Sequence, residues 1–395
     1  MSIKLSQRVQ AVKPSPTLAI TARAAELRAA GKDVIGLGAG EPDFDTPEHI
    51  KEAAIQAIHE GKTKYTPVDG TAELKQAVID KFRRDNGHDY AAEQILVSCG
   101  GKQSFYNLAQ ALLDPGEEVI IPAPYWVSYP DMTILAGGIP VYIRAGAAQQ
   151  FKITPEQLAA AITDKTRLLV LNSPSNPTGM AYTRAELEAL GEVLRQYPNI
   201  LVATDDMYEH ILWSDEPFCN ILMACPDLYD QTMVLNGVSK AYSMTGWRIG
   251  YAGGPADIIK SMKKIQSQST SNPTSISQAA AVAALNGPQD AIGTMLKAFR
   301  ERHDYVVERL NGMNGIDCLP TDGTFYVFPN IEGMIEATDG VSNDLEMGEY
   351  LIENAGVAVV PGSAFGLGGH MRISIATGMD ALQNALDRIE KVVNG

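Results

Sequence analysis

Residues Gly237 to Gly250 read GVSKAYSMTGWRIG and set a lysine, Lys240, eight residues before an arginine, Arg248. An apolar run typical of a β-strand precedes the lysine at 232–236, and another follows the arginine at 249–252. The small residues that leave room for a planar group near the lysine are Gly237, Ser239, Ala241 and Ser243. A neutral amine on a rigid segment can form a Schiff base with an aldehyde, and a guanidinium can hold a phosphate. The stretch therefore predicts a nucleophilic lysine beside an anion-binding arginine.

Strand and helix patterns alternate outward from this stretch through most of the chain. Short apolar runs rich in β-branched residues alternate with segments of helical spacing, which predicts an α/β fold with a mainly parallel sheet. The expected strands are 95–99, 118–122, 168–172, 200–205, 233–236 and 249–253, with helices such as 102–113 and 184–196 between them. The C-terminal pattern differs and predicts a smaller α+β domain. Its expected elements are strands 324–328, 357–360 and 371–376 and a closing helix 379–393.

The length of the chain predicts more than one domain. At 395 residues it exceeds the size that a single hydrophobic core usually serves. We expect residues 1–45 to form an N-terminal arm and part of the small domain. Residues 46–290 are expected to form the large domain and residues 291–395 the small C-terminal domain.

Composition indicates a soluble enzyme that acts on small molecules. The net charge of −15 disfavours binding to nucleic acid or to an anionic membrane surface. Apolar runs are too short to span a bilayer, and the first residues do not have the apolar core of a secretory signal. A cytoplasmic location is therefore expected, without a membrane or nucleic-acid partner.

Cysteine and histidine spacing disfavours a metal centre. The cysteines are Cys99, Cys219, Cys225 and Cys318. They do not form a CxxC pair, so we expect reduced thiols. The six histidines do not form HxxH or HExxH pairs, and no metal is expected. The glycine-rich segment at 36–47 also fails as a dinucleotide fingerprint, because Glu41 stands where the third glycine would be.

Chemically active residues follow four of the predicted strands. Gly100 and Gly101 come after one strand, residues 172–176 after a second, Asp205 ends a third and Lys240 follows a fourth. In an open parallel sheet, ligands bind at the carboxyl ends of the strands. These clusters are therefore expected to form one site.

Several motifs together resemble the class I, fold type I, pyridoxal-phosphate-dependent aminotransferases. They include the motif at Lys240, ATDDMYEH at 203–210, NSPSNPTG at 172–179 and HMRISIAT at 370–377. The resemblance runs essentially from end to end. It is closest to bacterial aspartate aminotransferases of the branch that includes aspartate/prephenate aminotransferases. It implies a three-layer fold whose large domain binds pyridoxal 5′-phosphate (PLP).

The resemblance implies how the cofactor ring is held. Lys240 would carry PLP as a Schiff base and act as the general base. Asp205 would pair with the pyridinium nitrogen and keep it protonated. Tyr208 and Asn176 would bond the phenolic oxygen, and Trp126 would stack on the ring face.

The resemblance also implies a phosphate site shared between two subunits. The backbone amides of Gly100, Gly101 and Lys102 would receive the phosphate at a helix N-terminus. Arg248 would supply the counter-charge. Tyr65 would reach the phosphate from a partner subunit, so a homodimer with shared active sites is expected. Many relatives carry a phosphate-binding serine at the position of Gly237.

Substrate contacts follow from the same resemblance. Arg372 would bind the α-carboxylate with its planar fork, and the backbone of Gly40 would contact the same group. Asn176 and Trp126 would also touch the substrate. The residues that match recognition of the side-chain carboxylate are Lys102, Ser15 and Thr17, and a lysine matching Lys13 is associated with prephenate.

These roles predict an aspartate aminotransferase that converts L-aspartate and 2-oxoglutarate to oxaloacetate and L-glutamate. Ping-pong kinetics are expected, together with transamination of prephenate. Other subgroups of the family act on alanine, aromatic amino acids or kynurenine, and these substrates remain alternatives. A fold-related PLP-dependent C–S lyase, which shares the lysine, the aspartate and the tyrosine, is a further alternative.

Overall fold

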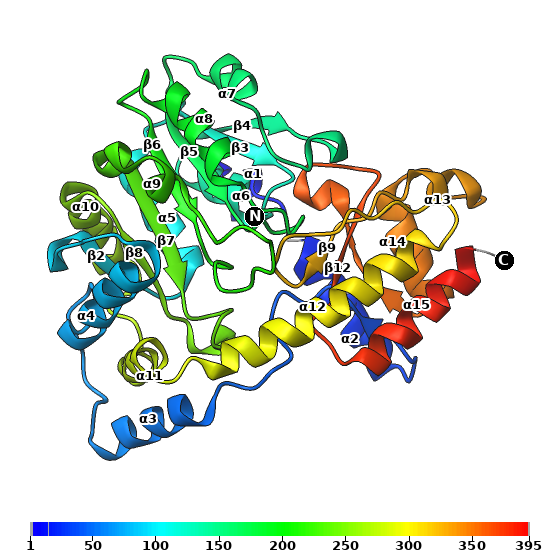
Figure 1. The fold of residues 1–395 in the computed structure, drawn as a ribbon, viewed down its shortest axis with the longest axis horizontal. Coiled ribbons are helices and arrows are strands. Elements are labelled where there is room, and N and C mark those ends of the chain that lie inside the picture. The colour runs from blue at the N-terminus through cyan, green and yellow to red at the C-terminus, as the bar shows by residue number, and fades with distance from the viewer. Residues whose placement is uncertain (1–2, 15, 394–395) are drawn as a thin grey trace.

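The main feature of the structure is a seven-stranded sheet with helices on both faces (Figure 1), seen in a computed structural model that describes residues 3–14 and 16–393. The strands are β2 (Ile95–Ser98), β3 (Glu118–Ala123), β4 (Ile139–Arg144), β5 (Thr166–Asn172), β6 (Leu201–Asp205), β7 (Thr232–Gly237) and β8 (Gly250–Gly253). They lie in the order β2-β8-β7-β6-β5-β3-β4. Strand β8 is antiparallel to both of its neighbours, and the remaining pairs are parallel. The prediction of a mainly parallel α/β sheet is confirmed.

Successive residues of a strand enter different hydrophobic cores, so both faces of this sheet must be covered. The covering helices are α3 (Glu48–His59), α4 (Ala72–Lys81), α5 (Gly101–Leu112), α6 (Ser128–Leu135), α7 (Pro155–Ala161), α8 (Arg184–Leu194), α9 (Ile221–Ala224), α10 (Ala256–Ser267) and α11 (Ser275–Asn286). In β7, Met233 and Leu235 pack with α5, α6 and α10, whereas Val234 between them packs with α3, α4 and α11. Helices α7, α8 and α9 cover the same face as α3, α4 and α11, in the part of the sheet nearer to β4.

Strand β4 is the one strand of this sheet that the sequence pattern does not predict. It contains Pro140, which donates no ladder hydrogen bond and is tolerated only where one side of a strand is free. The structure gives β4 such a place, because it forms an edge of the sheet and pairs with β3 alone among the described strands.

A second, smaller group of elements combines segments from the N-terminal and C-terminal parts of the chain. Its elements are α2 (Pro16–Ala29), β1 (Ile35–Gly36), α12 (Asp290–Asn311), β9 (Tyr326–Val327), α13 (Glu332–Ala337), α14 (Asp344–Asn354), β10 (Val357–Ala358), β11 (Val360–Pro361), β12 (Met371–Ser374) and α15 (Met379–Val393). Strand β1 pairs in parallel with β10, and β11, β12 and β9 form an antiparallel sheet. The long helix α12 leads from the large sheet into this group (Figure 1).

The predicted helix at 379–393 is confirmed, but the predicted strand at 357–360 is two strands. Its first half pairs with β1 and its second half with β12, so the chain changes sheets at Val359. An apolar run does not encode this change, because Val359 is as buried as its neighbours. The division of the chain at 45/46 and 290/291 stays a prediction, although the second boundary falls at the start of α12.

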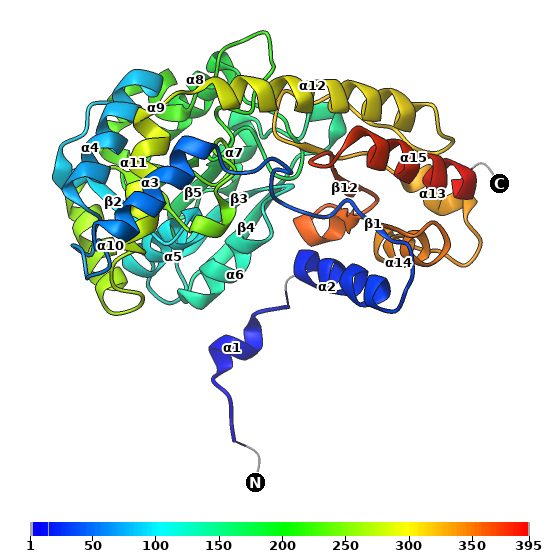
Figure 2. The same cartoon turned by 90° about the horizontal axis from the view of Figure 1, so that it is seen from below.

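The N-terminal segment before α2 projects from the rest of the fold (Figure 2) and approaches it at α6. Residues 3–11, which include the short helix α1 (Gln7–Ala11), are all exposed. The apolar side chains of Ile3, Leu5 and Val9 are therefore at the surface. None of the described helices is long and apolar enough to cross a membrane.

Strand β8 crosses the start of α5 at a distance that only glycine allows. A Cβ atom added to Gly250 would lie 2.3 Å from the nitrogen of Gly101 and 2.4 Å from the carbonyl carbon of Gly100. Because these contacts are with backbone atoms, a rotamer change cannot relieve them. The absence of a side chain at Gly250 therefore positions the start of α5 against the sheet.

We expect Gly250→Ala to destabilise the apoprotein by about 3 kcal/mol, the upper end of the usual cost of overpacking. Urea unfolding followed by circular dichroism measures this change. Gly246→Ala is the control, because a Cβ atom added there would meet no described atom within 4 Å. It should change the stability by less than about 0.5 kcal/mol. Equal stabilities of the two variants would contradict the close approach.

Candidate active site

A cavity of about 480 Å³ lies at the carboxyl ends of β5, β6 and β7 and is closed on one side by the small sheet. The predicted site residues that line it are Gly40, Gly101, Lys102, Trp126, Asn176, Asp205, Tyr208, Lys240, Arg248 and Arg372. Gly100 lies beside them, because a Cβ there would be 2.3 Å from Nη2 of Arg248. The expected convergence of the strand ends on one site is therefore observed.

Two of the predicted residues do not line this cavity. Tyr65 is 91% exposed, and Lys13 is exposed in the segment before α2. Ser15 lies outside the described residues, as does the side chain of Thr17. Their predicted roles stay predictions.

The loop that follows β7 carries Lys240 into the cavity. Its ammonium nitrogen donates a hydrogen bond to the carbonyl oxygen of Gly40 and lies 5.9 Å from the centre of the Tyr208 ring. Burial lowers the pKa of Lys240 to about 8, and the positive charges of Arg372 and Arg248 act in the same direction. The amine is thus neutral in a much larger fraction of molecules at pH 8 than an ordinary lysine would be.

Asp205 ends β6 and faces the cavity from the opposite side. Its Oδ2 accepts a hydrogen bond of 2.5 Å from the hydroxyl of Tyr129, and its Oδ1 accepts one of 3.3 Å from the amide of Met207. Burial raises the pKa of Asp205, while the hydrogen bond from Tyr129 opposes this effect. A carboxylate held in this way would be stabilised by a cation placed next to it.

The start of α5 forms an anion-binding end of the cavity. Helix α5 begins at Gly101, and its N-cap residue Gly100 has a φ of 91°, a conformation that favours glycine. Arg248, itself left-handed with a φ of 58°, donates from Nη1 to the carbonyl of Thr245 and from Nη2 to that of Cys99. Peptide N–H groups at a helix start and an adjacent guanidinium together suit a phosphate.

Arg372 lines the cavity from β12 of the small sheet. Its Nη1 donates to Oδ1 of Asn176 at 2.8 Å, and its Nη2 donates to the carbonyl of Gly38 at 2.8 Å. The guanidinium carbon lies 4.3 Å from the centre of the Tyr326 ring. Its Nε is buried without a hydrogen-bond partner in the described part of the chain. This buried and incompletely paired guanidinium is suited to an incoming carboxylate.

Lys102 and Trp126 line a further part of the cavity wall. The ammonium of Lys102 lies 5.2 Å from the centre of the Trp126 ring. Burial lowers the pKa of Lys102, and Arg248 adds to this effect, whereas Asp131 opposes it. Lys102 therefore adds a positive charge to the lining of the cavity.

Sequence reasoning missed two tyrosines of the site. Tyr129 holds Asp205, and the Tyr326 hydroxyl lies 3.2 Å from that of Tyr208. Tyr129 follows Trp126 by three residues in the motif APYWVSY, so this motif contained a usable signal. Tyr326 lies in an apolar strand pattern that does not distinguish it from a core residue.

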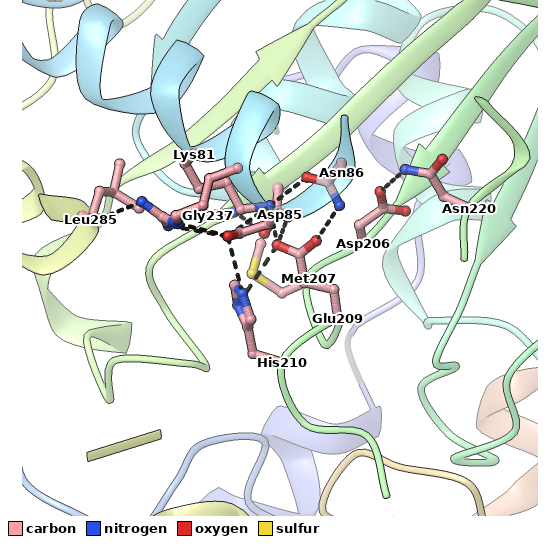
Figure 3. A network of polar contacts seen from close by, with 12 residues as sticks. Lys81, Asp85, Asn86, Asp206, Met207, Glu209, His210, Asn220, Gly237 and Leu285 are labelled. Atoms are coloured by element: carbon pink, nitrogen blue, oxygen red, sulfur yellow. Dashed lines mark hydrogen bonds and ion pairs between the residues drawn. The ribbon is translucent and has the colours of Figure 1, made fainter. Parts of the chain in front are cut away.

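The cysteines and the possible metal ligands do not line the cavity. Cys99, Cys219, Cys225 and Cys318 are free thiols, as predicted. Among the described residues, Asp85, Glu209 and His210 have ligand atoms close enough to share an ion (Figure 3). The ammonium of Lys81 forms an ion pair with Glu209 and lies 3.9 Å from Asp85. Lys81 thus already supplies a positive charge to this group.

Comparison with known proteins agrees with this geometry. The chain belongs to the aminotransferase class I and II family, which it matches over residues 32–389. Enzymes of this family are PLP-dependent transaminases. The chain is 60% identical to the aspartate/prephenate aminotransferase of Nitrosomonas europaea over 99% of this chain and 100% of that protein. It is 51% identical to the aspartate aminotransferase of Geobacillus stearothermophilus over 98% of each chain.

Solved structures show the same fold. The aspartate aminotransferase of Rhizobium meliloti superposes with a TM-score of 0.96 at 50% identity, covering 100% of this chain and 99% of that one. The aspartate aminotransferase of Thermus thermophilus with maleate gives a TM-score of 0.93 at 44% identity, covering 99% and 100%. The predicted family and fold are confirmed.

The low pKa of Lys240 predicts a distinct chemical reactivity in the apoprotein. Its acylation rate should rise through a midpoint near pH 8, well below the value of about 10.4 for ordinary lysines. Arg372→Gln removes a positive charge that disfavours the protonated amine, so the midpoint should move to higher pH. Peptide mass spectrometry after brief acylation at a series of pH values measures both. A midpoint that stays in place or falls in the variant would contradict this account.

Proposed function

We propose that the protein is an aspartate aminotransferase that transfers the amino group of L-aspartate to 2-oxoglutarate and that also transaminates prephenate. The observation that carries the proposal is the cavity in which Lys240, Asp205, Arg248 and Arg372 surround one space. PLP, when bound, supplies an aldehyde that captures the substrate amine and a ring that accepts electrons from the substrate carbon. The names of the relatives at 51–60% identity support this substrate class.

The cavity fits PLP at both ends of the cofactor. The open cradle at Gly100, which a Cβ would fill, and the guanidinium of Arg248 match the phosphate. The buried carboxylate of Asp205 matches a protonated ring nitrogen. Asp205 and Arg248 line the same cavity, so together they would define the orientation of the ring.

Lys240 is proposed to be the proton-transfer group. Its pKa of about 8 leaves a neutral amine that can take a proton from the α-carbon of the substrate and return it to the product. The carbonyl of Gly40 holds the ammonium form between these transfers. The nitrogen of Lys240 lies 5.9 Å and 5.8 Å from the centres of the Tyr208 and Phe325 rings, so aromatic surface borders it on one side.

Arg372 and Asn176 are proposed to orient the substrate. Arg372 binds the oxygen of the Asn176 amide, which leaves the amide nitrogen of Asn176 free to donate into the cavity. The unpartnered Nε of Arg372 offers a further donor to an α-carboxylate. A carboxylate fixed in this way points the α-carbon toward Lys240.

A panel of amino donors and 2-oxo acids, scored by kcat/KM, tests the function. Aspartate and glutamate should be preferred over alanine, phenylalanine and kynurenine, prephenate should be transaminated, and initial rates should give the parallel lines of ping-pong kinetics. Release of pyruvate and ammonia from cysteine derivatives without an oxo acid would instead identify a lyase.

Asp205→Asn should retain PLP but lower kcat roughly 10³-fold, within the range seen when a charge-stabilising group is removed. The variant lacks the negative charge that holds a proton on the ring nitrogen. Single-turnover absorbance with aspartate measures the loss. The isosteric amide is chosen because it keeps the size of the side chain. A kcat near that of the unmodified enzyme would refute the role.

Lys102→Ala should reduce activity toward acidic donors selectively. Loss of a charge-assisted hydrogen bond in a dry site costs about 1.5–3 kcal/mol, or roughly 10- to 150-fold in kcat/KM for aspartate. Phenylalanine and alanine should be affected far less. PLP affinity is measured in parallel, because the Lys102 amide also opens α5. Equal losses for acidic and neutral donors, with PLP still bound, would show that Lys102 does not select the substrate.

A homodimer with shared active sites is proposed on the position of Tyr65. Its side chain is 91% exposed and lies outside the cavity of its own chain. Ile55 and Ile58 of the nearby α3 are also exposed, at 52% and 53%. Exposed apolar side chains grouped in this way are typical of a contact surface. The cytoplasmic location stays a prediction from composition.

Hybrid dimers test the shared site. Tyr65→Phe should weaken PLP binding by roughly 10-fold or more through the loss of one hydrogen bond to an anion. The hybrid is a heterodimer of one Lys240→Ala subunit and one Tyr65→Phe subunit. If the sites are shared, one of its two sites combines the intact Lys240 of the second subunit with the intact Tyr65 of the first. That hybrid should regain one site of high PLP affinity per dimer. A hybrid whose sites all bind PLP weakly would show that Tyr65 acts within its own subunit.

A further inference from the structure

The turn that follows β6 directs its side chains to two different sides. Asp205 and Tyr208 line the cavity. Asp206 and Glu209 face away from it into the protein interior, where they meet polar partners from other segments (Figure 3). Both side chains are buried, with exposures of 0% and 6%. The proposed function uses the first pair and leaves the second without a role.

Glu209 has both carboxylate oxygens engaged. The ammonium of Lys81 contacts Oε1, which also accepts a hydrogen bond of 2.7 Å from Nδ2 of Asn236. Oε2 accepts one of 2.8 Å from Nδ2 of Asn86. Burial acts to raise the pKa of Glu209, but Lys81, His210 and Asn86 together hold that pKa below its ordinary value. Glu209 is therefore a charged acceptor at the centre of three segments.

Lys81 and Asn86 bring α4 into this group. Lys81 ends α4 with an exposure of 0% and donates a hydrogen bond of 2.7 Å to Oδ1 of Asn86. The next residues form a π-helical turn, η1 (Phe82–Asn86), which places Asn86 beside Lys81. Lys81, Asn86 and Glu209 thus form a closed triangle of polar contacts. π-Helical turns are rare and are frequent near functional sites.

Asn236 connects this triangle to the lysine-bearing segment. It is the last but one residue of β7 and precedes Lys240 by four positions. Its Nδ2 donates to Glu209, and its Oδ1 accepts a hydrogen bond of 2.7 Å from the amide of Gly237. One side chain therefore links the Asp205–Tyr208 turn to the strand end that leads to Lys240.

We propose that Glu209, held by Lys81, is a positioning residue that fixes the Asp205–Tyr208 turn against the segment bearing Lys240. A catalytic arrangement depends on supporting residues that lock the geometry of the groups touching the ligand. A buried ion pair suits this purpose, because moving the turn away from α4 would separate two charges in the interior. The hydrogen bond from Asn236 then ties the fixed carboxylate to the segment that leads to Lys240. The inference rests on the proposed function only in requiring that the cavity binds PLP.

The test compares Glu209→Gln and Asn236→Ala with a matched control. Glu209→Gln keeps the shape of the side chain but removes the closer of the two carboxylates that face Lys81, and it offers only one oxygen to two amide donors. Asn236→Ala keeps the ion pair and removes only the link to β7, so it carries the test if Glu209→Gln does not fold. The control is Lys152→Met, which removes another buried lysine from an ion pair, that with the partly exposed Glu186, outside the cavity lining.

Three quantities are measured without any substrate: the Kd for PLP, the pH midpoint of Lys240 acylation in the apoprotein, and the unfolding temperature. We expect Glu209→Gln and Asn236→Ala to weaken PLP binding by about 10- to 100-fold, as a small displacement of supporting groups does. The acylation midpoint should rise toward the ordinary lysine value, because a loosened segment admits water. Lys152→Met should lower the unfolding temperature and leave the other two quantities unchanged.

Two outcomes would overturn the proposal. In the first, Glu209→Gln and Asn236→Ala lower only the unfolding temperature, which would make the group merely structural. In the second, Lys152→Met weakens PLP binding as much as they do, which would make the effect general. Because no substrate is present, failure of the aspartate aminotransferase assignment would appear in the donor panel and leave these measurements unaffected.

Discussion

The lowered pKa of the Lys240 amine is the constraint on which the rest of the site depends. An amine can act as a base only when it is neutral, and burial together with two nearby guanidinium groups lowers its pKa to about 8. The same two groups, Arg248 and Arg372, line the cavity. The positive charges of these two arginines therefore lower the pKa of Lys240 and would also attract a phosphate and a carboxylate. Anions bound beside them would offset the arginine charges, so the effect on Lys240 depends on what the site contains.

Asp205 is the electrostatic counterpart of Lys240. Burial that favours a neutral lysine also disfavours an ionised aspartate, and the pKa of Asp205 is accordingly raised. The hydroxyl of Tyr129 partly offsets this effect by donating to the carboxylate. A cation introduced between the walls of the cavity would stabilise the ionised form much further. The cavity thus holds a carboxylate whose charge is best accommodated when a positively charged ring nitrogen lies beside it.

The sequence predicts the central part of the site well, because that part is encoded locally. Asp205 and Tyr208 lie in one motif, and Asn176, Lys240 and Gly100 each follow a strand with a recognisable apolar pattern. Parallel neighbours in the order β7-β6-β5 bring these strand ends together, which the rule for open sheets anticipates. Residues that reach the site through packing of distant segments are harder to predict. Tyr326 resembles a core residue of a short strand, and only the small sheet as assembled brings its hydroxyl to Tyr208.

The same distinction separates the two sides of the turn after β6. The side that faces the cavity can be identified from the motif, whereas Lys81, Asn86 and Asn236 belong to segments with no shared sequence signal. They meet only because α4 ends in a π-helical turn beneath the end of β7. A buried cluster of polar side chains costs free energy unless each member has hydrogen-bond partners. Both carboxylate oxygens of Glu209 have such partners. Polar burial of this kind restricts the backbone more than an apolar contact would, because hydrogen bonds depend on direction as well as distance. The rigidity of Asp205 and Lys240 in the cavity therefore derives in part from residues on the side of the turn that no ligand touches.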